Sequence, residues 1–89
     1  MSLFAVLSPK ENHKLETAIK EKFPDNYQQL SPTQWIISAK GTAKQISDKL
    51  GVSIKENPVG NAVILGINSY WGRASTDLWD WMKVKIEEE

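Results

Sequence analysis

Short apolar runs along the chain predict a set of β-strands. Three runs rich in β-branched or aromatic residues are typical of buried strands: residues 2–8, 34–39 and 61–67. A weaker and more polar stretch at 26–31 precedes the second run, and the Ser-Pro-Thr between them predicts a turn or a bulge. The pattern therefore predicts four strands, one of them less hydrophobic than the others.

Apolar residues at helical spacing predict a first helix over residues 9–23. Ser8 is the expected N-cap, and Pro9 suits the first helical position because its missing N–H is not needed there. Glu11 stands three residues after Ser8, as in a capping box. Pro24 is expected to end the helix.

Two further helices are expected. The middle helix begins after a capping box of Thr42 and Gln45, and Gly51 is its expected C-terminal stop. The last helix is expected to start near Ser75 or Thr76 and to run toward the acidic tail.

The order of these elements predicts the fold class. Strand, helix, strand, strand, helix, strand is the ferredoxin-like split βαβ pattern (βαββαβ), here with an added C-terminal helix. We expect a single α+β domain over residues 1–89. The central strands, 2–8 and 34–39, are continuously apolar, so both of their faces need cover. Either the third helix or a second copy of the sheet must supply it, and we expect a homodimer packed through sheets or strand edges.

Composition narrows the function classes. The chain has no cysteine, which excludes disulfides and thiolate metal sites. Its formal net charge is zero, which argues against bulk electrostatic capture of long nucleic acid. No run approaches the roughly 20 apolar residues of a membrane span. We therefore expect a cytoplasmic protein without a membrane partner.

Candidate catalytic residues are few. His13 falls on the polar side of the first helix and is expected to be solvated. Asp77 and Asp80 stand three residues apart on the last helix, so their side chains can be neighbours. Acids this early in a helix more often complement its dipole. We expect no catalytic residue, metal or cofactor, and a metal-dependent endoribonuclease using Asp77 and Asp80 is kept as an alternative.

The last helix carries an aromatic cluster. Residues 69–83 hold three of the four tryptophans and the only arginine. At about 100° per residue, four side chains share one arc and form the predicted core face: Leu78, Trp79, Met82 and Ile86. Trp81 lies outside this arc. It is expected to be a subunit contact, a ligand platform or a flank against the sheet.

The connection before this helix is a candidate nucleotide site. Gly72 permits a sharp turn, Arg73 beside a helix N-terminus could clamp a phosphate, and Tyr70 or Trp71 could stack on a base. The structural alternative is a rigid loop with Trp71 on the sheet edge and Arg73 paired to a carboxylate. Lys40 and Lys44, with Lys49 as a further candidate, could add a modest basic patch, unless they belong to a solvated helix face. The candidate ligand-binding residues are Tyr70, Trp71, Arg73, Trp81, Lys40 and Lys44.

Three motifs carry a resemblance to a known family. They are a strand with W-I-I, a T-A-x-x-I-x-x-x-L helix and a terminal W-D-W. With them the chain, from FAVLS to WDWMK, resembles small prokaryotic proteins that carry a SinR-family label. These are similar to the small CRISPR-associated subunit of the spacer-integration complex and to virulence-associated ribonucleases of the same shape. The resemblance implies a ferredoxin-like dimer with a link to mobile elements or phage defence.

One departure from that family limits what the resemblance implies. Members similar to the integration subunit end the first strand with an aspartate, proposed to hold a divalent metal at the dimer interface. Leu7 and Ser8 stand at that place in this chain, so the metal site does not carry over. The leading hypothesis is a non-catalytic dimeric protein that binds a nucleotide or nucleic acid. A metal-dependent endoribonuclease and a protein-interaction or structural module are the alternatives.

Overall fold

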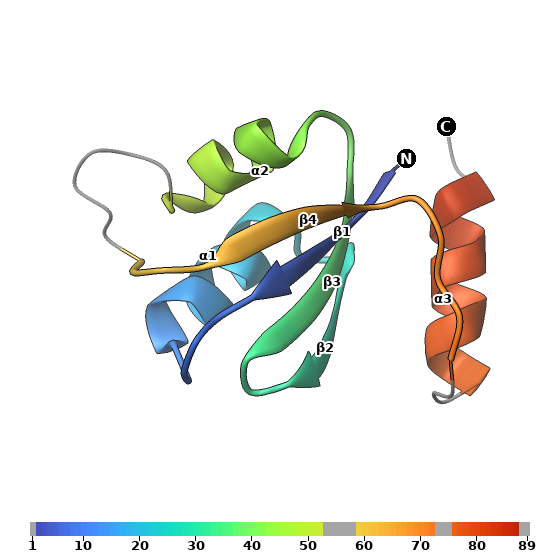
Figure 1. The fold of residues 1–89 in the computed structure, drawn as a ribbon, viewed down its shortest axis with the longest axis horizontal. Helices are drawn as coiled ribbons and strands as arrows, with labels where there is room; N and C mark the ends of the chain where they lie inside the picture. The colour runs from blue at the N-terminus through green and yellow to red at the C-terminus, as the bar shows by residue number, and fades with distance from the viewer. Residues whose placement is uncertain (1, 53–58, 73–75, 88–89) are drawn as a thin grey trace.

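The computed structural model describes residues 2–52, 59–72 and 76–87 (Figure 1). The predicted strands and helices are present in the predicted order. Their bounds are β1 (Ser2–Leu7), α1 (His13–Lys22), β2 (Tyr27–Ser31), β3 (Gln34–Ala39), α2 (Ala43–Leu50), β4 (Val63–Ile67) and α3 (Thr76–Glu87). None of the helices among these residues is both long and apolar enough to span a membrane.

The four strands form one antiparallel sheet in the order β2-β3-β1-β4. The two most apolar strands, β1 and β3, are neighbours in its centre, and in their register Phe4 lies opposite Ile37. This topology confirms the α+β class and is compatible with the expected ferredoxin-like fold.

Helices α1 and α2 cover one face of the sheet (Figure 1). Because side chains alternate between the faces of a strand, every second residue of β1 and β3 points toward these helices. The buried cluster on this side includes Phe4, Val6, Trp35 and Ile37 from the strands, Leu15 and Ile19 from α1, and Ile46 and Leu50 from α2. This is the main hydrophobic core.

The other face of the sheet is covered in part by α3 (Figure 1). Leu3 of β1, Ile36 of β3 and Met82 of α3 form a second, smaller buried cluster there. The expectation that the central strands need cover on both faces is confirmed at this end of the sheet, where the third helix supplies it.

The start of α1 differs from the prediction. The helix begins at His13, and its N-cap is Asn12, whose side-chain Oδ1 accepts a hydrogen bond from the Leu15 N–H at 3.0 Å. Ser8 stands five residues before the helix and does not cap it; its hydroxyl donates to the Lys10 carbonyl. The side-chain Nδ2 of Asn12 also donates to the backbone carbonyl of Val59, in the segment before β4. That long-range contact is the physical reason for the later start.

We expect Asn12→Ala to lower the free energy of unfolding by about 1–2 kcal/mol, because an N-cap and a tertiary hydrogen bond are lost together. Ser8→Ala is the matched control and should change it by less than about 0.5 kcal/mol. Urea denaturation followed by far-UV circular dichroism measures both. A larger effect of Ser8→Ala than of Asn12→Ala would contradict this assignment of the cap.

Both ends of α2 follow the prediction. The Gln45 N–H donates to Thr42 Oγ1 at 3.2 Å, and the Thr42 N–H donates to Gln45 Oε1 at 2.9 Å, which completes the capping box. Gly51 ends the helix with φ of 88°, a left-handed conformation that favours glycine.

Candidate ligand-binding surfaces

An aromatic pocket lies where the segment after β4 runs beside α3. The rings of Tyr70 and Trp79 stack, with centroids 5.4 Å apart and planes inclined by 16°. A hollow of about 310 Å³ adjoins them. Its lining, which defines the aromatic pocket, is Tyr70, Trp71, Gly72, Trp79, Asp80 and Lys83.

Trp71 is the most exposed large apolar side chain of the described residues, at 97%. Tryptophan is highly buried on average, so a ring this exposed beside two further aromatic rings is a candidate binding surface. Next to it, Gly72 has φ of 151° with no atom near the place of a Cβ. The chain therefore turns at Gly72 as predicted, in a backbone conformation that other residues rarely adopt.

Trp81 packs against its own chain. It is partly buried on the cluster of Leu3, Ile36 and Met82, as is Trp79. On the helix wheel Trp81 lies about 60° outside the predicted arc. The long indole ring reaches the sheet from that flank. Of the three roles considered for Trp81, the flank against the sheet describes its position, and Trp81 does not line the aromatic pocket.

Ile86 was expected on the core face of α3, and this is wrong: its side chain is 46% exposed. The packed stripe is centred on Leu78 and Met82, with one tryptophan on each flank. The α3 residues that pack against the sheet, the two tryptophans among them, lie in the first two turns of the helix. Ile86 stands in the last turn and lies outside this contact.

Arg73 lies outside the described residues, as does Ser75. The role of Arg73 as a phosphate clamp beside the aromatic pocket therefore stays a prediction.

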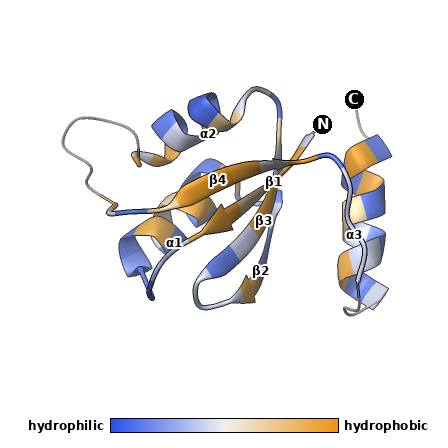
Figure 2. Cartoon of the chain, viewed as in Figure 1, coloured by the Kyte–Doolittle hydropathy of each residue, from blue (hydrophilic) through white to orange (hydrophobic). Residues whose placement is uncertain are grey.

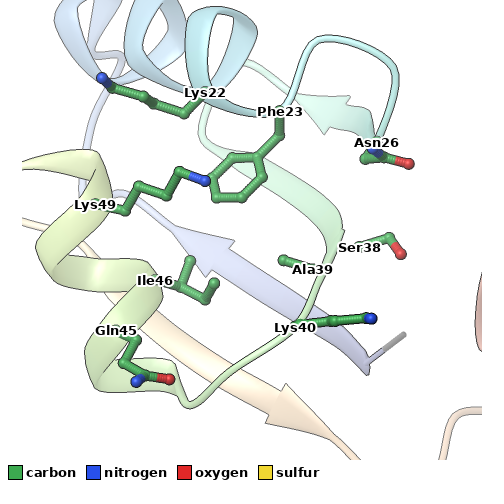
Figure 3. Close-up of a pocket in the computed structure, with 9 residues that line it drawn as sticks. All are labelled: Lys22, Phe23, Asn26, Ser38, Ala39, Lys40, Gln45, Ile46 and Lys49. Atoms are coloured by element: carbon green, nitrogen blue, oxygen red, sulfur yellow. The ribbon is translucent and has the colours of Figure 1, made fainter. Parts of the chain in front are cut away.

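Lys40 and Lys44 have different surroundings. Lys44 pairs with Asp48 along α2, with 2.9 Å between Nζ and Oδ2. Lys40 follows β3 and lines a groove beside α1 and α2, together with Lys22 and Lys49 (Figure 3). This groove adjoins the main core, whereas the aromatic pocket adjoins the α3 cluster on the opposite face of the sheet. Lys40 does not line the aromatic pocket.

Sequence reasoning missed Lys22, whereas Lys49 was already a candidate third member of the patch with Lys40. Lys22 and Lys49 each stand in the last turn of a helix. A cation there complements the helix dipole, which is a sufficient local explanation for each residue alone. Only the packing of α1 beside α2 brings the two helix ends to one groove, so no local pattern could have revealed it.

Carboxylates do not gather among the described residues. No three of their His, Asp and Glu side chains come close enough to share a metal ion. Asp77 and Asp80 are both exposed, and Asp80 lines the aromatic pocket. His13 is exposed and lies 3.7 Å from a carboxylate oxygen of Glu16. The endoribonuclease alternative therefore gains no observation of its own from this part of the chain.

Comparisons of the chain with protein-family models, with curated proteins and with solved structures return no significant match.

Proposed function

We propose that the protein is a non-catalytic, dimeric binding protein whose ligand is a nucleotide or a short nucleic acid. The observation that carries this proposal is the exposed Trp71 ring beside the stacked Tyr70 and Trp79 rings. The resemblance to CRISPR-associated integration subunits is a second and weaker support, because fold likeness alone does not assign a ligand.

The aromatic pocket offers the groups that a nucleotide needs. Every base has a π-face, and stacking on an aromatic side chain is worth about 1–3 kcal/mol per base without sequence preference. Lys83 lines the same pocket and can contact a phosphate, while Asp80 can accept hydrogen bonds from a base or ribose. Arg73, two residues after Trp71, joins this proposal on its place in the sequence alone.

The dimer part of the proposal rests on the sheet face that α3 leaves open. Leu7 lies opposite Val63, and Ala5 lies opposite Leu65, so these side chains share that face. Leu7, Val63 and Leu65 are all exposed. Figure 2 shows the hydrophobic colouring over most of β4. We call Ala5, Leu7, Val63 and Leu65 the open-face patch.

A second copy of this chain is the occupant that suits the open-face patch. The residues of β1, β3 and β4 include no charged side chain, so two such faces can meet without burying a charge. The chain carries no net charge, so two copies do not repel each other strongly. Strand β4 is also an edge of the sheet, and its unpaired backbone groups favour pairing with another strand.

We expect Trp71→Ala to weaken nucleotide binding about tenfold, because one stacking contact is lost. The measurement is quenching of tryptophan fluorescence during titration with AMP and with a ten-residue oligothymidylate. Trp71→Phe is the matched control, since it keeps a π-face, and should lose less than about threefold.

Two outcomes would contradict the proposed function. One is an absence of quenching in the wild-type protein at millimolar AMP and at micromolar oligothymidylate. The other is an affinity of Trp71→Ala, measured by calorimetry, that equals the wild-type value.

A further inference from the structure

The groove beside α1, α2 and the end of β3 has the composition of a binding site (Figure 3). It encloses about 500 Å³. Its apolar floor comes from Phe23, Ala39 and Ile46, which also belong to the main core. Lys22 at the end of α1 and Lys49 in the last turn of α2 stand on its walls. We call it the lysine groove.

The polar groups around the lysine groove favour an anion. Lys22, Lys40 and Lys49 line it, and no Asp or Glu does. The other long polar side chains are Asn26 and Gln45. Because Gln45 Oε1 already accepts from the Thr42 N–H, its NH₂ group is what it can offer a ligand. In a chain with zero net charge, this local excess of donors and cations is specific to the groove.

These three lysines differ from others on the helices. Lys20 pairs with Glu16 at 3.1 Å, and Lys44 pairs with Asp48 at 2.9 Å. Within the part of the chain that the structure describes, Lys22, Lys40 and Lys49 lie in no ion pair. The helix dipole accounts for a cation at the end of each helix, but Lys40 lies outside both helices. The dipole therefore does not explain why all three line one groove.

Lys49 is held in place. Its Nζ lies 5.0 Å from the centroid of the Phe23 ring, within range of a cation–π interaction. A side chain that is already ordered loses less conformational entropy when a ligand binds. Phe23 itself is buried under Lys49, so its ring is not available for stacking on a base. The groove thus offers charge without an aromatic platform.

The layout of the lysines indicates the shape of the ligand. In Figure 3 the Lys49 ammonium points to the Phe23 ring in the middle of the groove, while Lys22 and Lys40 extend toward opposite sides. Because the three ammonium groups do not converge in this view, a single phosphate matches them less well than an extended ligand does. A chain of linked phosphates can place successive phosphates at successive lysines.

We propose that the lysine groove is a second binding site, which takes a linear chain of linked phosphates along Lys22, Lys49 and Lys40. The chain can come from a free polyphosphate or from the backbone of a single-stranded nucleic acid. The site adjoins the face of the sheet opposite the aromatic pocket, so it does not depend on the function proposed for Trp71.

The test compares inorganic tripolyphosphate, orthophosphate and a ten-residue oligothymidylate by isothermal titration calorimetry. The groove variant is Lys22→Gln/Lys40→Gln/Lys49→Gln. The matched control is Lys10→Gln/Lys14→Gln/Lys20→Gln, which removes the same amount of charge outside the groove. Far-UV circular dichroism checks that both variants fold, and the single variant Lys40→Gln serves if the triple does not.

We expect wild-type protein to bind tripolyphosphate at least tenfold more tightly than orthophosphate. The groove variant should lose at least tenfold in affinity, Lys40→Gln alone about threefold, and the control less than threefold. For oligothymidylate the slope of log affinity against log salt should become shallower by about 2, at roughly 0.7 per phosphate contact on a single strand. If the groove variant loses affinity for oligothymidylate, the phosphate chain that the groove binds is a nucleic-acid backbone. If it loses affinity for tripolyphosphate alone, the ligand is free polyphosphate.

Three results would overturn the proposal: wild-type protein that binds no linked phosphate, a groove variant that keeps wild-type affinity, or a control that loses as much as the groove variant. Trp71→Ala is measured in parallel and should leave tripolyphosphate affinity unchanged. Failure at the lysine groove and failure at the aromatic pocket are thereby distinguished.

Discussion

Replacing Trp35 with alanine is expected to lower the free energy of unfolding by about 3–5 kcal/mol. Trp35 comes from the central strand β3, is 1% exposed and lies in the main core with side chains from both covering helices. Its removal leaves a cavity that the surrounding sheet and helices cannot fully close. Domains of this kind are stable by only about 5–15 kcal/mol, so the substitution should remove a large part of the free energy of unfolding.

Trp35→Phe should be far milder, with a loss of about 1–2 kcal/mol. The indole Nε1 is buried and has no hydrogen-bond acceptor among the described residues. Such an unpaired donor costs about 1–3 kcal/mol, and phenylalanine removes that cost while it keeps most of the ring. The benefit offsets part of the packing that is lost.

Urea denaturation of wild type, Trp35→Ala and Trp35→Phe, followed by far-UV circular dichroism, measures both effects. Trp71→Phe is the surface control and should stay within about 0.5 kcal/mol of wild type. If Trp35→Phe were as destabilising as Trp35→Ala, the indole N–H would have a partner and the argument for its cost would be wrong.

Replacing Leu65 with glutamate is expected to convert the proposed dimer into a monomer. Leu65 is central to the open-face patch and is 47% exposed in the single chain. In a two-fold interface one substitution acts twice, so two carboxylates would be brought together in an apolar contact. Burying unpaired charges costs several kcal/mol, which is comparable to what holds a small interface together.

Sedimentation equilibrium over a range of micromolar concentrations measures this effect. Leu30→Glu is the matched control: the residue type and the exposed fraction are the same, but Leu30 lies on β2, the other edge of the sheet. A wild-type protein that sediments as a monomer, or a Leu65→Glu protein that remains dimeric, would refute a dimer through this face.

Features with local causes could be predicted from the sequence. The capping box of Thr42 and Gln45 and the stop at Gly51 depend on residues within one turn of each other, and the structure confirms them. The turn at Gly72 belongs to the same group. The apolar runs likewise identify the central strands β1 and β3, because burial on both faces leaves a continuous hydrophobic signal.

Features that depend on contacts between distant parts of the chain could not be predicted from the sequence. The N-cap of the first helix is Asn12 and not Ser8, and Asn12 also binds the Val59 carbonyl, 47 residues away in sequence. Trp81 lies outside the core face that the helical wheel predicts, yet it packs against the cluster of Leu3, Ile36 and Met82 between α3 and the sheet. In both cases the sequence predicted the helix itself, but the position of the N-cap and the packing of Trp81 involve contacts with other elements of the fold.

The candidate surfaces divide in the same way. The sequence by itself determined that Tyr70, Trp71 and the helix carrying Trp79 lie close together, since a short connection joins them. Only the tertiary structure decided that Tyr70 stacks on Trp79, that Lys40 lines a groove and not the aromatic pocket, and that Lys22 joins Lys40 and Lys49 in that groove. The physical reason is that neighbours along a helix or turn are set by bond geometry, whereas neighbours between elements are set by how the helices pack on the sheet.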